Sequence, residues 1–184
     1  MTPLELKALN FATDAHRGQV RKYTGEPYIE HPIAVVALLL RTINADEITI
    51  AAAYLHDVVE DTDISIDAIR SNFGPVISDI VSSLTDIGSS AGNRATRKRI
   101  DRERLEASGP RAQTIKLADL IDNTSSIEEH DPKFAKVYMA EKRMLLKSLS
   151  SGNAVLWRRA QAQINAYYLT HTFEPRVHQA EGAA

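Results

Sequence analysis

Apolar residues are spaced at helical intervals along almost the whole chain, and this spacing constrains the fold more than any other feature. Near the N-terminus, Leu6, Leu9, Ala12 and Ala15 recur at the three- and four-residue steps of one helix face. The chain has no sustained alternation of apolar and polar residues, and no Asn-Gly or Asp-Gly pair of the kind that closes a β-hairpin. The sequence therefore predicts an all-α protein.

Prolines, glycines and capping residues divide this pattern into separate helices. Thr2-Pro3 and Asp131-Pro132 each place a capping side chain before a proline, a typical helix start. We expect helices over residues 3–15, 33–43, 47–59, 63–73, 76–84, 93–106, 111–126, 132–149 and 154–169. The segment 47–59 contains neither Gly nor Pro, so it is expected to be one unbroken helix.

The composition is that of an ordinary globular chain and excludes several kinds of site. Apolar residues make up 43% and charged residues 25% of the 184, which suits one compact domain. We expect this domain to span residues 1–171 and a polar C-terminal tail to follow at residues 172–184. Because cysteine is absent, disulfides, cysteine-ligated zinc or iron–sulfur sites and thiol nucleophiles are excluded.

The charge balance and the apolar runs bear on partners and location. The formal net charge is -2, and a protein that binds nucleic acid usually presents a basic face instead. The longest apolar run, residues 33–40, is far shorter than the roughly 20 residues of a membrane span. The N-terminus also lacks the basic flank and apolar core of a signal peptide. We therefore expect a cytoplasmic protein that binds neither nucleic acid nor membrane.

The string His56-Asp57-Val58-Val59-Glu60-Asp61 carries most of the chemical information. Four of its six residues are metal-ligand or acid–base types, and they follow an apolar helical stretch. In a helix, His56 and Glu60 would lie on one face and Asp57 and Asp61 on the next, so all four can converge. A bound cation would offset the cost of burying these charges. The alternative is a helix end with solvated acids.

Two further residues could complete a metal site. His31 lies before Pro32 at a junction between loop and helix, and Asp119 lies within the apolar run Ile115-Lys-Leu-Ala-Asp-Leu-Ile121. An acid in such a run needs a partner or a role. Taken singly, each has a simpler interpretation, a hydrogen-bonded loop histidine and a solvated aspartate.

Several short motifs, in order along the chain, resemble those of the HD-domain phosphohydrolases. These motifs are Ala15-His-Arg-Gly-Gln-Val-Arg-Lys22, Gly25-Glu-Pro-Tyr-Ile-Glu-His-Pro32, Leu55-His-Asp-Val-Val-Glu-Asp-Thr62, Phe73-Gly74 and Lys116-Leu-Ala-Asp119 with Asn123. Within that family, the chain is most similar to the hydrolase half of Rel/SpoT-type stringent-response enzymes and to small alarmone hydrolases. The resemblance covers residues 9–147 and implies a single compact HD-domain helical bundle.

The resemblance also implies roles for particular residues. The metal ligands would be His31, His56, Asp57 and Asp119, holding one divalent ion, usually Mn2+ in this family. Glu60 and Asp61 would be the catalytic acids, one helical turn beyond the ligands, close enough to orient a water or protonate a leaving oxygen. A bound divalent ion also lowers the pKa of its water.

Other positions would bind the nucleotide by the same resemblance, and each has a simpler alternative. The substrate-binding residues would be Arg21, Lys22, Arg94, Asn123 and Tyr138. Arg21 and Lys22 could instead be a solvated basic pair, and Tyr138 a core tyrosine. Arg94 begins a segment in which six of eleven residues are basic, and that segment could be a solvated helix with local ion pairs.

Three positions depart from the family pattern, all on the nucleotide side. Leu120 and Ser125 stand where a basic residue and an arginine are usual, and Asp122 stands where a ring is common. We expect a metal-dependent 3′-pyrophosphohydrolase of (p)ppGpp and/or (p)ppApp, as a monomer or small homo-oligomer. The alternatives are a phosphohydrolase of another nucleotide and a non-catalytic alarmone-binding regulator.

Overall fold

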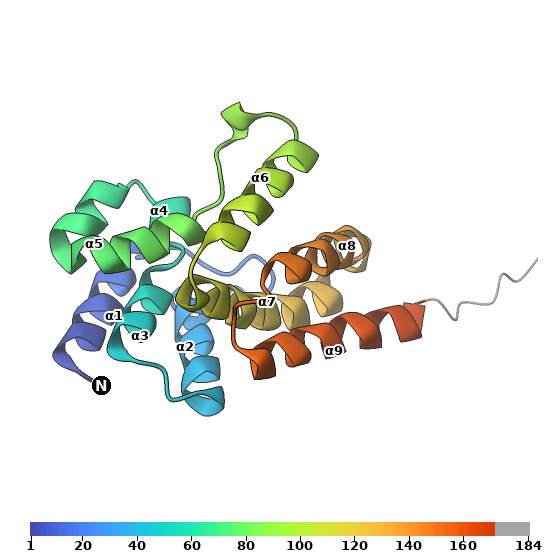
Figure 1. Cartoon of the computed structure of the whole chain (residues 1–184), viewed down its shortest axis with the longest axis horizontal. Helices are drawn as coiled ribbons and strands as arrows, with labels where there is room; N and C mark the ends of the chain where they lie inside the picture. The colour runs from blue at the N-terminus through green and yellow to red at the C-terminus, as the bar shows by residue number, and fades with distance from the viewer. Residues whose placement is uncertain (172–184) are drawn as a thin grey trace, which may run out of the picture.

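The computed structural model describes residues 1–171, and all of its regular elements there are helical (Figure 1). The α-helices are α1 (Pro3–Ala15), α2 (Glu30–Thr42), α3 (Glu47–Leu55), α4 (Val58–Asp61), α5 (Ile66–Leu84), α6 (Arg94–Ala107), α7 (Pro110–His130), α8 (Pro132–Ser148) and α9 (Ala154–His171). A short 3-10 helix, η1 (Ser89–Ala91), precedes α6. The all-α prediction is confirmed, whereas the predicted tail at 172–184 lies outside the described residues.

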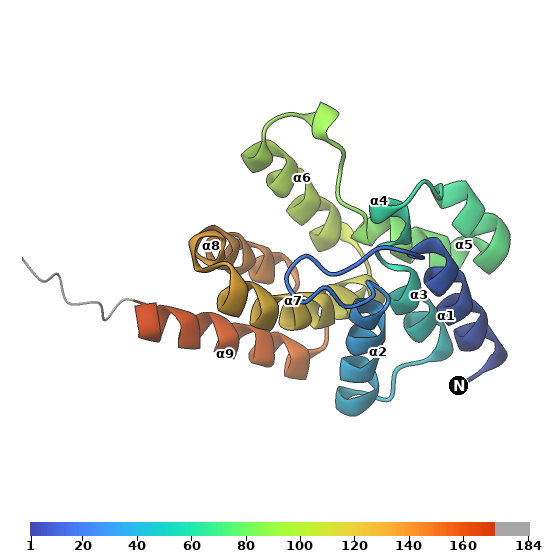
Figure 2. The same cartoon turned by 180° about the vertical axis from the view of Figure 1, so that it is seen from behind.

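Helix α7 runs through the middle of the molecule and joins its two halves (Figures 1 and 2). On one side it packs against α2, α3 and α5, and on the other against α8 and α9. Its buried residues form an almost continuous run from Ala112 to Ile121, so α7 is buried on most sides in this stretch. Polar residues in this run therefore lie inside the protein, where they need partners.

The core is built from aliphatic side chains of both halves. Leu39, Ile50, Leu55, Ile115, Leu117, Leu149 and Leu156 are all buried with almost no exposed surface. Helix α1 packs along α3, and α3 packs against α5, so the first half is a small bundle of its own. This packing holds the ends of α2 and α3 at fixed positions beside α7.

The predicted unbroken helix at 47–59 is wrong, because the structure divides it into α3 and α4. The chain leaves the helix at His56 and Asp57, and Asp57 has φ -100° and ψ -5°. Successive side chains of a regular helix point about 100° apart. The break instead brings His56 Nε2 and Asp57 Oδ2 to 3.1 Å, so both face the same point.

Other boundaries follow local chemistry. The segment expected as two helices around Gly74-Pro75 forms α5 with a kink, where Gly74 has φ 82°, a conformation that favours glycine. The loop before α2 is held by an isolated antiparallel bridge between Val20 and Pro27. Within residues 1–171, no helix combines the length and the apolar character required to cross a membrane.

Candidate active site

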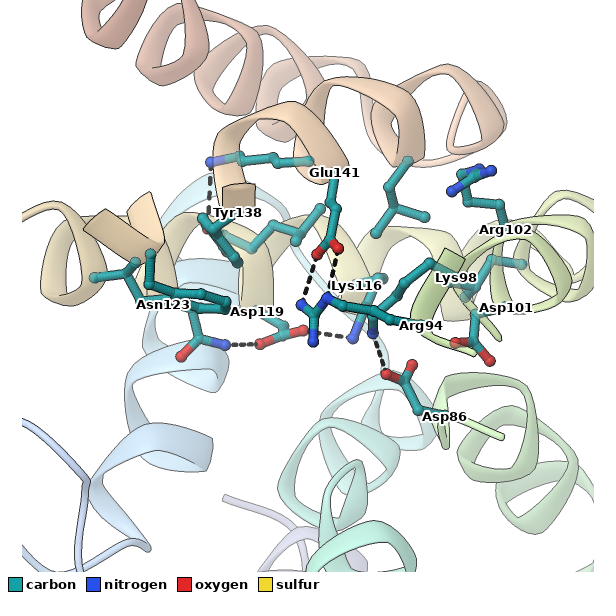
Figure 3. A pocket seen from close by; sticks show the side chains of 16 residues that line it. Asp86, Arg94, Lys98, Asp101, Arg102, Lys116, Asp119, Asn123, Tyr138 and Glu141 are labelled. Atoms are coloured by element: carbon teal, nitrogen blue, oxygen red, sulfur yellow. Dashed lines mark hydrogen bonds and ion pairs between the residues drawn. The ribbon is translucent and has the colours of Figure 1, made fainter. Parts of the chain in front are cut away.

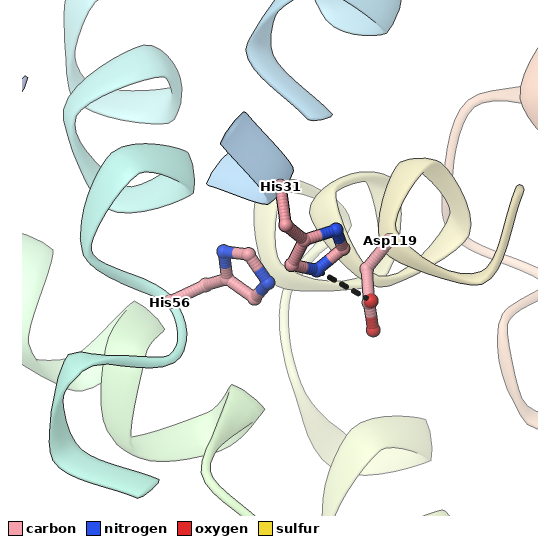
Figure 4. Close-up of side chains that lie close together, drawn as sticks. All are labelled: His31, His56 and Asp119. Carbon is pink, nitrogen blue, oxygen red and sulfur yellow. Dashed lines mark ion pairs between the residues drawn. The ribbon is translucent and has the colours of Figure 1, made fainter. Parts of the chain in front are cut away.

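Three buried side chains from separate helices meet beside α7. His31 comes from the start of α2, His56 from the residue after α3, and Asp119 from the middle of α7 (Figure 4). Each offers one ligand atom, and these atoms lie within 4.8 Å of one another. None of the three residues is more than 4% exposed, so their polar atoms are shielded from bulk water and need partners within the protein or a bound ion.

The two imidazoles are oriented in the same way. His56 Nδ1 donates to the carbonyl of Ala53 at 2.8 Å, and His31 Nδ1 contacts Asp122 Oδ2 at 2.7 Å. Each Nε2 is buried and has no hydrogen-bond partner among the described residues. Two unpartnered imidazole nitrogens beside a carboxylate form a donor set that fits a divalent metal ion.

Asp57 lies beside this cluster. Its Oδ2 is 3.1 Å from His56 Nε2 and 3.5 Å from His31 Nε2, and it accepts a hydrogen bond from the Tyr28 hydroxyl at 2.7 Å. Burial raises the pKa of the Asp57 carboxyl, but the neighbouring imidazoles of His56 and His31 outweigh burial and hold it below its usual value. The structure thus brings together all four residues predicted as metal ligands.

The charge of the acids also acts on His31. Burial lowers the pKa of His31, but the carboxylates of Asp119, Asp122 and Asp57 outweigh it and raise this pKa to about 10. Without a metal ion, a proton therefore helps to balance the negative charge. A metal ion that binds here has to displace protons from its ligands, so its affinity depends on pH.

The predicted catalytic acids occupy α4, one turn after the cluster. Glu60 and Asp61 line a hollow that also includes Gln19. Burial and the charge of Asp86 raise the pKa of Glu60 to about 7, while the backbone N–H of Asp86 donates to Glu60 Oε2 at 3.0 Å. Burial also raises the pKa of Asp61. A carboxyl with a pKa near 7 can take up or release a proton at neutral pH.

On the other side of Asp119, a pocket opens between α6, α7 and α8 (Figure 3). Arg94, Lys98, Lys116, Asn123 and Tyr138 line it. Three of the cations that line it have acidic partners within this chain. Arg94 makes a two-point contact with Glu141 at 2.6 and 2.8 Å, Lys98 pairs with Asp86, and Lys116 pairs with Asp119 at 2.8 Å.

The residues predicted to bind the nucleotide divide between this pocket and the loop before α2. Asn123 Nδ2 donates to Asp119 Oδ1 at 2.5 Å, and the Tyr138 hydroxyl is 3.4 Å from the carbonyl of Leu120. Arg21 donates to Asp122 at 2.8 Å, whereas Lys22 is largely exposed and donates to the Tyr23 hydroxyl at 3.1 Å. Arg21 and Lys22 line a second, smaller hollow that shares Asn123 with the pocket.

Four partners of the site were not predicted from the sequence. Lys116 and Asp122 stand three residues before and after Asp119, a spacing that places them near it on α7 and could have been noticed. Tyr28 belongs to a quoted motif, but its bond to Asp57 depends on the loop. Lys142 lies on α8 and is buried, with Nζ bonded to the Leu120 carbonyl, Thr124 and Gln163. No feature of the sequence around Lys142 indicates that it is buried or that it bonds to α7.

Comparison with known families and proteins agrees with this geometry. The sequence pattern of the family described as "HD domain" matches residues 8–147. Human guanosine-3′,5′-bis(diphosphate) 3′-pyrophosphohydrolase MESH1 is 37% identical over 130 residues, which cover 70% of this chain and 72% of the human protein. A probable guanosine-3′,5′-bis(diphosphate) 3′-pyrophosphohydrolase of Synechocystis is 36% identical over 156 residues, 83% of this chain, which spans only 20% of that relative's length.

A solved structure shares the fold closely. It is that of a metazoan ortholog of SpoT that hydrolyses ppGpp, with a TM-score of 0.83 and 31% sequence identity. The match covers 92% of this chain and 98% of the other. The similarity therefore extends over nearly the whole of both chains.

Proposed function

The chain belongs to the HD-domain family, and from this premise we propose that it is a metal-dependent 3′-pyrophosphohydrolase of nucleotide alarmones. The substrates are (p)ppGpp and/or (p)ppApp, and the products are pyrophosphate and the nucleoside 5′-di- or triphosphate. The observation that carries this proposal is the pair of buried, unpartnered Nε2 atoms of His31 and His56 beside Asp119. Human and Drosophila relatives that are 37% and 39% identical to this chain are named as 3′-pyrophosphohydrolases of guanosine-3′,5′-bis(diphosphate).

In this proposal, His31, His56, Asp57 and Asp119 hold one divalent ion, and the ion is Mn2+. When bound, such an ion acidifies a coordinated water and stabilises negative charge on a phosphoryl oxygen. The support is the donor set, since imidazole nitrogens and carboxylate oxygens together suit a first-row divalent metal. Tyr28 and Asn123 donate to Asp57 and Asp119 and so fix the orientation of both carboxylates.

Glu60 and Asp61 handle protons beside this cluster. The pKa of Glu60, about 7, means that its carboxyl exchanges a proton at neutral pH. Asp61 is held from the other side, because the Gln19 amide donates to its backbone carbonyl at 2.7 Å. Two acids placed beside a metal site favour catalysis over binding alone, which argues against a non-catalytic regulator.

The remaining residues bind the nucleotide. Arg94 and Tyr138 lie in the pocket next to Asp119, where they meet the phosphates and the sugar, while Arg21 and Lys22 on the loop meet the base and its phosphates. Asn123 lies between the two hollows and contacts both parts of the substrate. Because a guanidinium can stack on any purine, Arg21 supports binding of guanosine and adenosine nucleotides alike.

The test is a product assay with Mn2+ across guanosine and adenosine nucleotides that carry a 3′-diphosphate. GTP and ATP, which lack that group, are the controls. We expect pyrophosphate and the matching 5′-nucleotide from both purines, and nothing from the controls. Release of orthophosphate alone, or turnover of GTP, would favour the alternative of a phosphohydrolase acting on another nucleotide.

We place the reaction in the cytoplasm, with the protein a monomer or small homo-oligomer.

A further inference from the structure

One carboxylate oxygen joins the loop before α2 to the metal cluster. Asp122 Oδ2 lies 2.7 Å from His31 Nδ1 and 2.8 Å from an Arg21 terminal nitrogen. All three side chains are mostly buried, with 18% of Asp122, 15% of Arg21 and 3% of His31 exposed. The contacts are thus shielded from solvent, which strengthens them.

The hydrogen bond to Asp122 decides which nitrogen of His31 faces the cluster. Because Nδ1 is engaged by Asp122, Nε2 is the atom directed toward Asp119 and Asp57, at 3.3 and 3.5 Å. His56 is held in the same orientation by a backbone carbonyl, that of Ala53. A backbone carbonyl is present whatever the side chain, whereas the partner of His31 depends on the residue at position 122.

We propose that Asp122 is a positioning residue, which orients His31 toward the metal ion and also holds the nucleotide-binding Arg21. This inference rests on the proposed function for its nucleotide half, and on the metal site alone for its other half. Ligand histidines usually donate their second nitrogen to such an outer carboxylate or carbonyl, and loss of that partner typically weakens metal binding by roughly 10–100-fold.

Position 122 carries a carboxylate where the family pattern commonly has a ring. This buried charge is paired, because Asp122 Oδ2 contacts both His31 and Arg21. Arg21 donates to Asp122 Oδ2 and, at 3.4 Å, to Asn123 Oδ1, so its charge balances the carboxylate. Burial raises the pKa of Asp122, but His31 and Arg21 outweigh burial and keep the carboxyl ionised. Arg21 and Asp122 therefore form an ion pair, and the same Asp122 carboxylate also contacts His31.

The test is a calorimetric titration of metal-free protein with Mn2+, combined with steady-state hydrolysis of ppGpp. Asp122→Ala removes the carboxylate, and Asp122→Asn keeps its size without the charge. Arg21→Ala releases the loop but leaves Asp122 on His31. Asp79→Asn is the matched control, since Asp79 also pairs with an arginine, Arg70, at 2.6 Å and lies on α5 away from the site.

We expect Asp122→Ala to bind Mn2+ roughly 10–100-fold more weakly and to show a raised KM. Asp122→Asn should lose less Mn2+ affinity, because its amide oxygen can still accept from His31 Nδ1, and should also show a raised KM, because its charge no longer holds Arg21. Arg21→Ala should raise KM and keep the Mn2+ affinity of the wild type. Asp79→Asn should keep the wild-type values of both KM and Mn2+ affinity. If Mn2+ affinity falls in the Asp122 variants although the wild type hydrolyses no alarmone, the orienting role stands and the proposed substrate is wrong.

Three results would overturn the inference. The first is equal Mn2+ affinity in the wild type and both Asp122 variants. The second is an equal loss of Mn2+ affinity in Arg21→Ala and Asp122→Ala, because the loop rather than the carboxylate would then control the site. The third is a wild-type chain that binds no Mn2+, which would remove the metal site together with the role of Asp122.

Discussion

The metal cluster and the pocket between α6 and α8 lie on either side of Asp119, and they differ in how their polar and charged side chains are partnered. In the cluster, the Nε2 atoms of His31 and His56 are buried and make no hydrogen bond to a described residue, although Asp119 lies 3.3 Å from the first and Asp57 3.1 Å from the second. In the pocket, Arg94 and Lys98 are already paired with acids of the same chain, Glu141 and Asp86. The cluster presents ring nitrogens without hydrogen bonds, whereas Arg94 and Lys98 in the pocket are already in ion pairs.

The difference shows how each region receives its ligand. A cation that enters the cluster finds donors in place and displaces only protons. A phosphate that binds Arg94 or Lys98 in this pocket would have to replace Glu141 or Asp86, so part of its binding energy would go into breaking those ion pairs. We therefore expect the cluster to bind its ion with the donors already in place and the pocket to exchange partners, so variants of the two regions should differ in the size of their effects.

The largest effect is expected from removal of a cluster ligand. His56→Gln should lower ppGpp hydrolysis by more than about a hundredfold, because ligands matter more than the outer partners whose loss costs roughly 10–100-fold. In the metal-free protein His56 contacts the Ala53 carbonyl and Asp57, so thermal unfolding of the metal-free variant shows whether the fold tolerates the change. Hydrolysis rates and thermal unfolding of metal-free protein measure both. Full activity in His56→Gln would contradict the cluster's role.

Replacing an acid beside the cluster should slow turnover without removing the ion. Glu60→Gln cannot exchange a proton, so kcat should fall by roughly a hundredfold, the scale of a positioned acid or base, while Mn2+ affinity is kept. The same holds for Asp61→Asn. Glu129→Gln, an exposed acid near the end of α7, is the control. Normal turnover in both amide variants would show that the acids take no part in the chemistry.

Lys142, a buried cation that also lines the pocket between α6 and α8, gives a pH-dependent prediction. Lys142 bonds only to neutral oxygens, and burial lowers its pKa to about 7. A free lysine titrates near pH 10.4, so between these values the unfolded chain binds one more proton than the folded chain. The free energy of unfolding therefore rises with pH in this window, by at most about 1.4 kcal/mol per pH unit.

Lys142→Met should lack this rise, so its unfolding midpoint should gain less than the wild type between about pH 7 and pH 10. Thermal unfolding across this range compares the slopes, and Lys147→Met, an exposed lysine on the same helix, is the control. Parallel curves for Lys142→Met and the wild type would mean that Lys142 keeps an ordinary pKa. The pKa of Lys142 would then differ less from the pKa values of the ion-paired cations in the pocket than its neutral contacts indicate.

The smallest effect is expected from freeing a pocket cation. Glu141→Gln removes the acid that holds Arg94, whose side chain is 48% exposed. Ion pairs this exposed contribute about 0.2–1 kcal/mol, so KM should fall by at most about fivefold. Steady-state kinetics with ppGpp measures this change. A raised KM would mean that Glu141 itself contacts the substrate, and that the pocket does not work by exchange of partners.

The sequence was informative where local rules decide the outcome. Helical spacing, prolines and caps predicted most helices, and the resemblance to the HD-domain family implied one ligand set of His31, His56, Asp57 and Asp119, which lie together in the structure. The break between α3 and α4 was missed because propensity favours a continuous helix there, and tertiary contacts at His56 and Asp57 override it.

The contacts that were not predicted are those between distant segments. Arg21 and Asp122 are 101 residues apart, and nothing in either local sequence indicates that they meet. Asp122 could be read from sequence only as a departure from the family pattern, and its bond to His31 needs the positions of both α2 and α7. The pairing of Arg94 with Glu141 likewise depends on how α6 packs on α8.

We propose that the cluster of His31, His56, Asp57 and Asp119 binds the one divalent ion that hydrolysis requires. Metal-free wild type and His56→Gln, each titrated calorimetrically with Mn2+, test this most directly. The account predicts one ion per wild-type chain, no measurable binding to His56→Gln, and activity that returns to the wild type in proportion to bound Mn2+. Equal binding by both proteins, or full activity of the wild type before any metal is added, would contradict it.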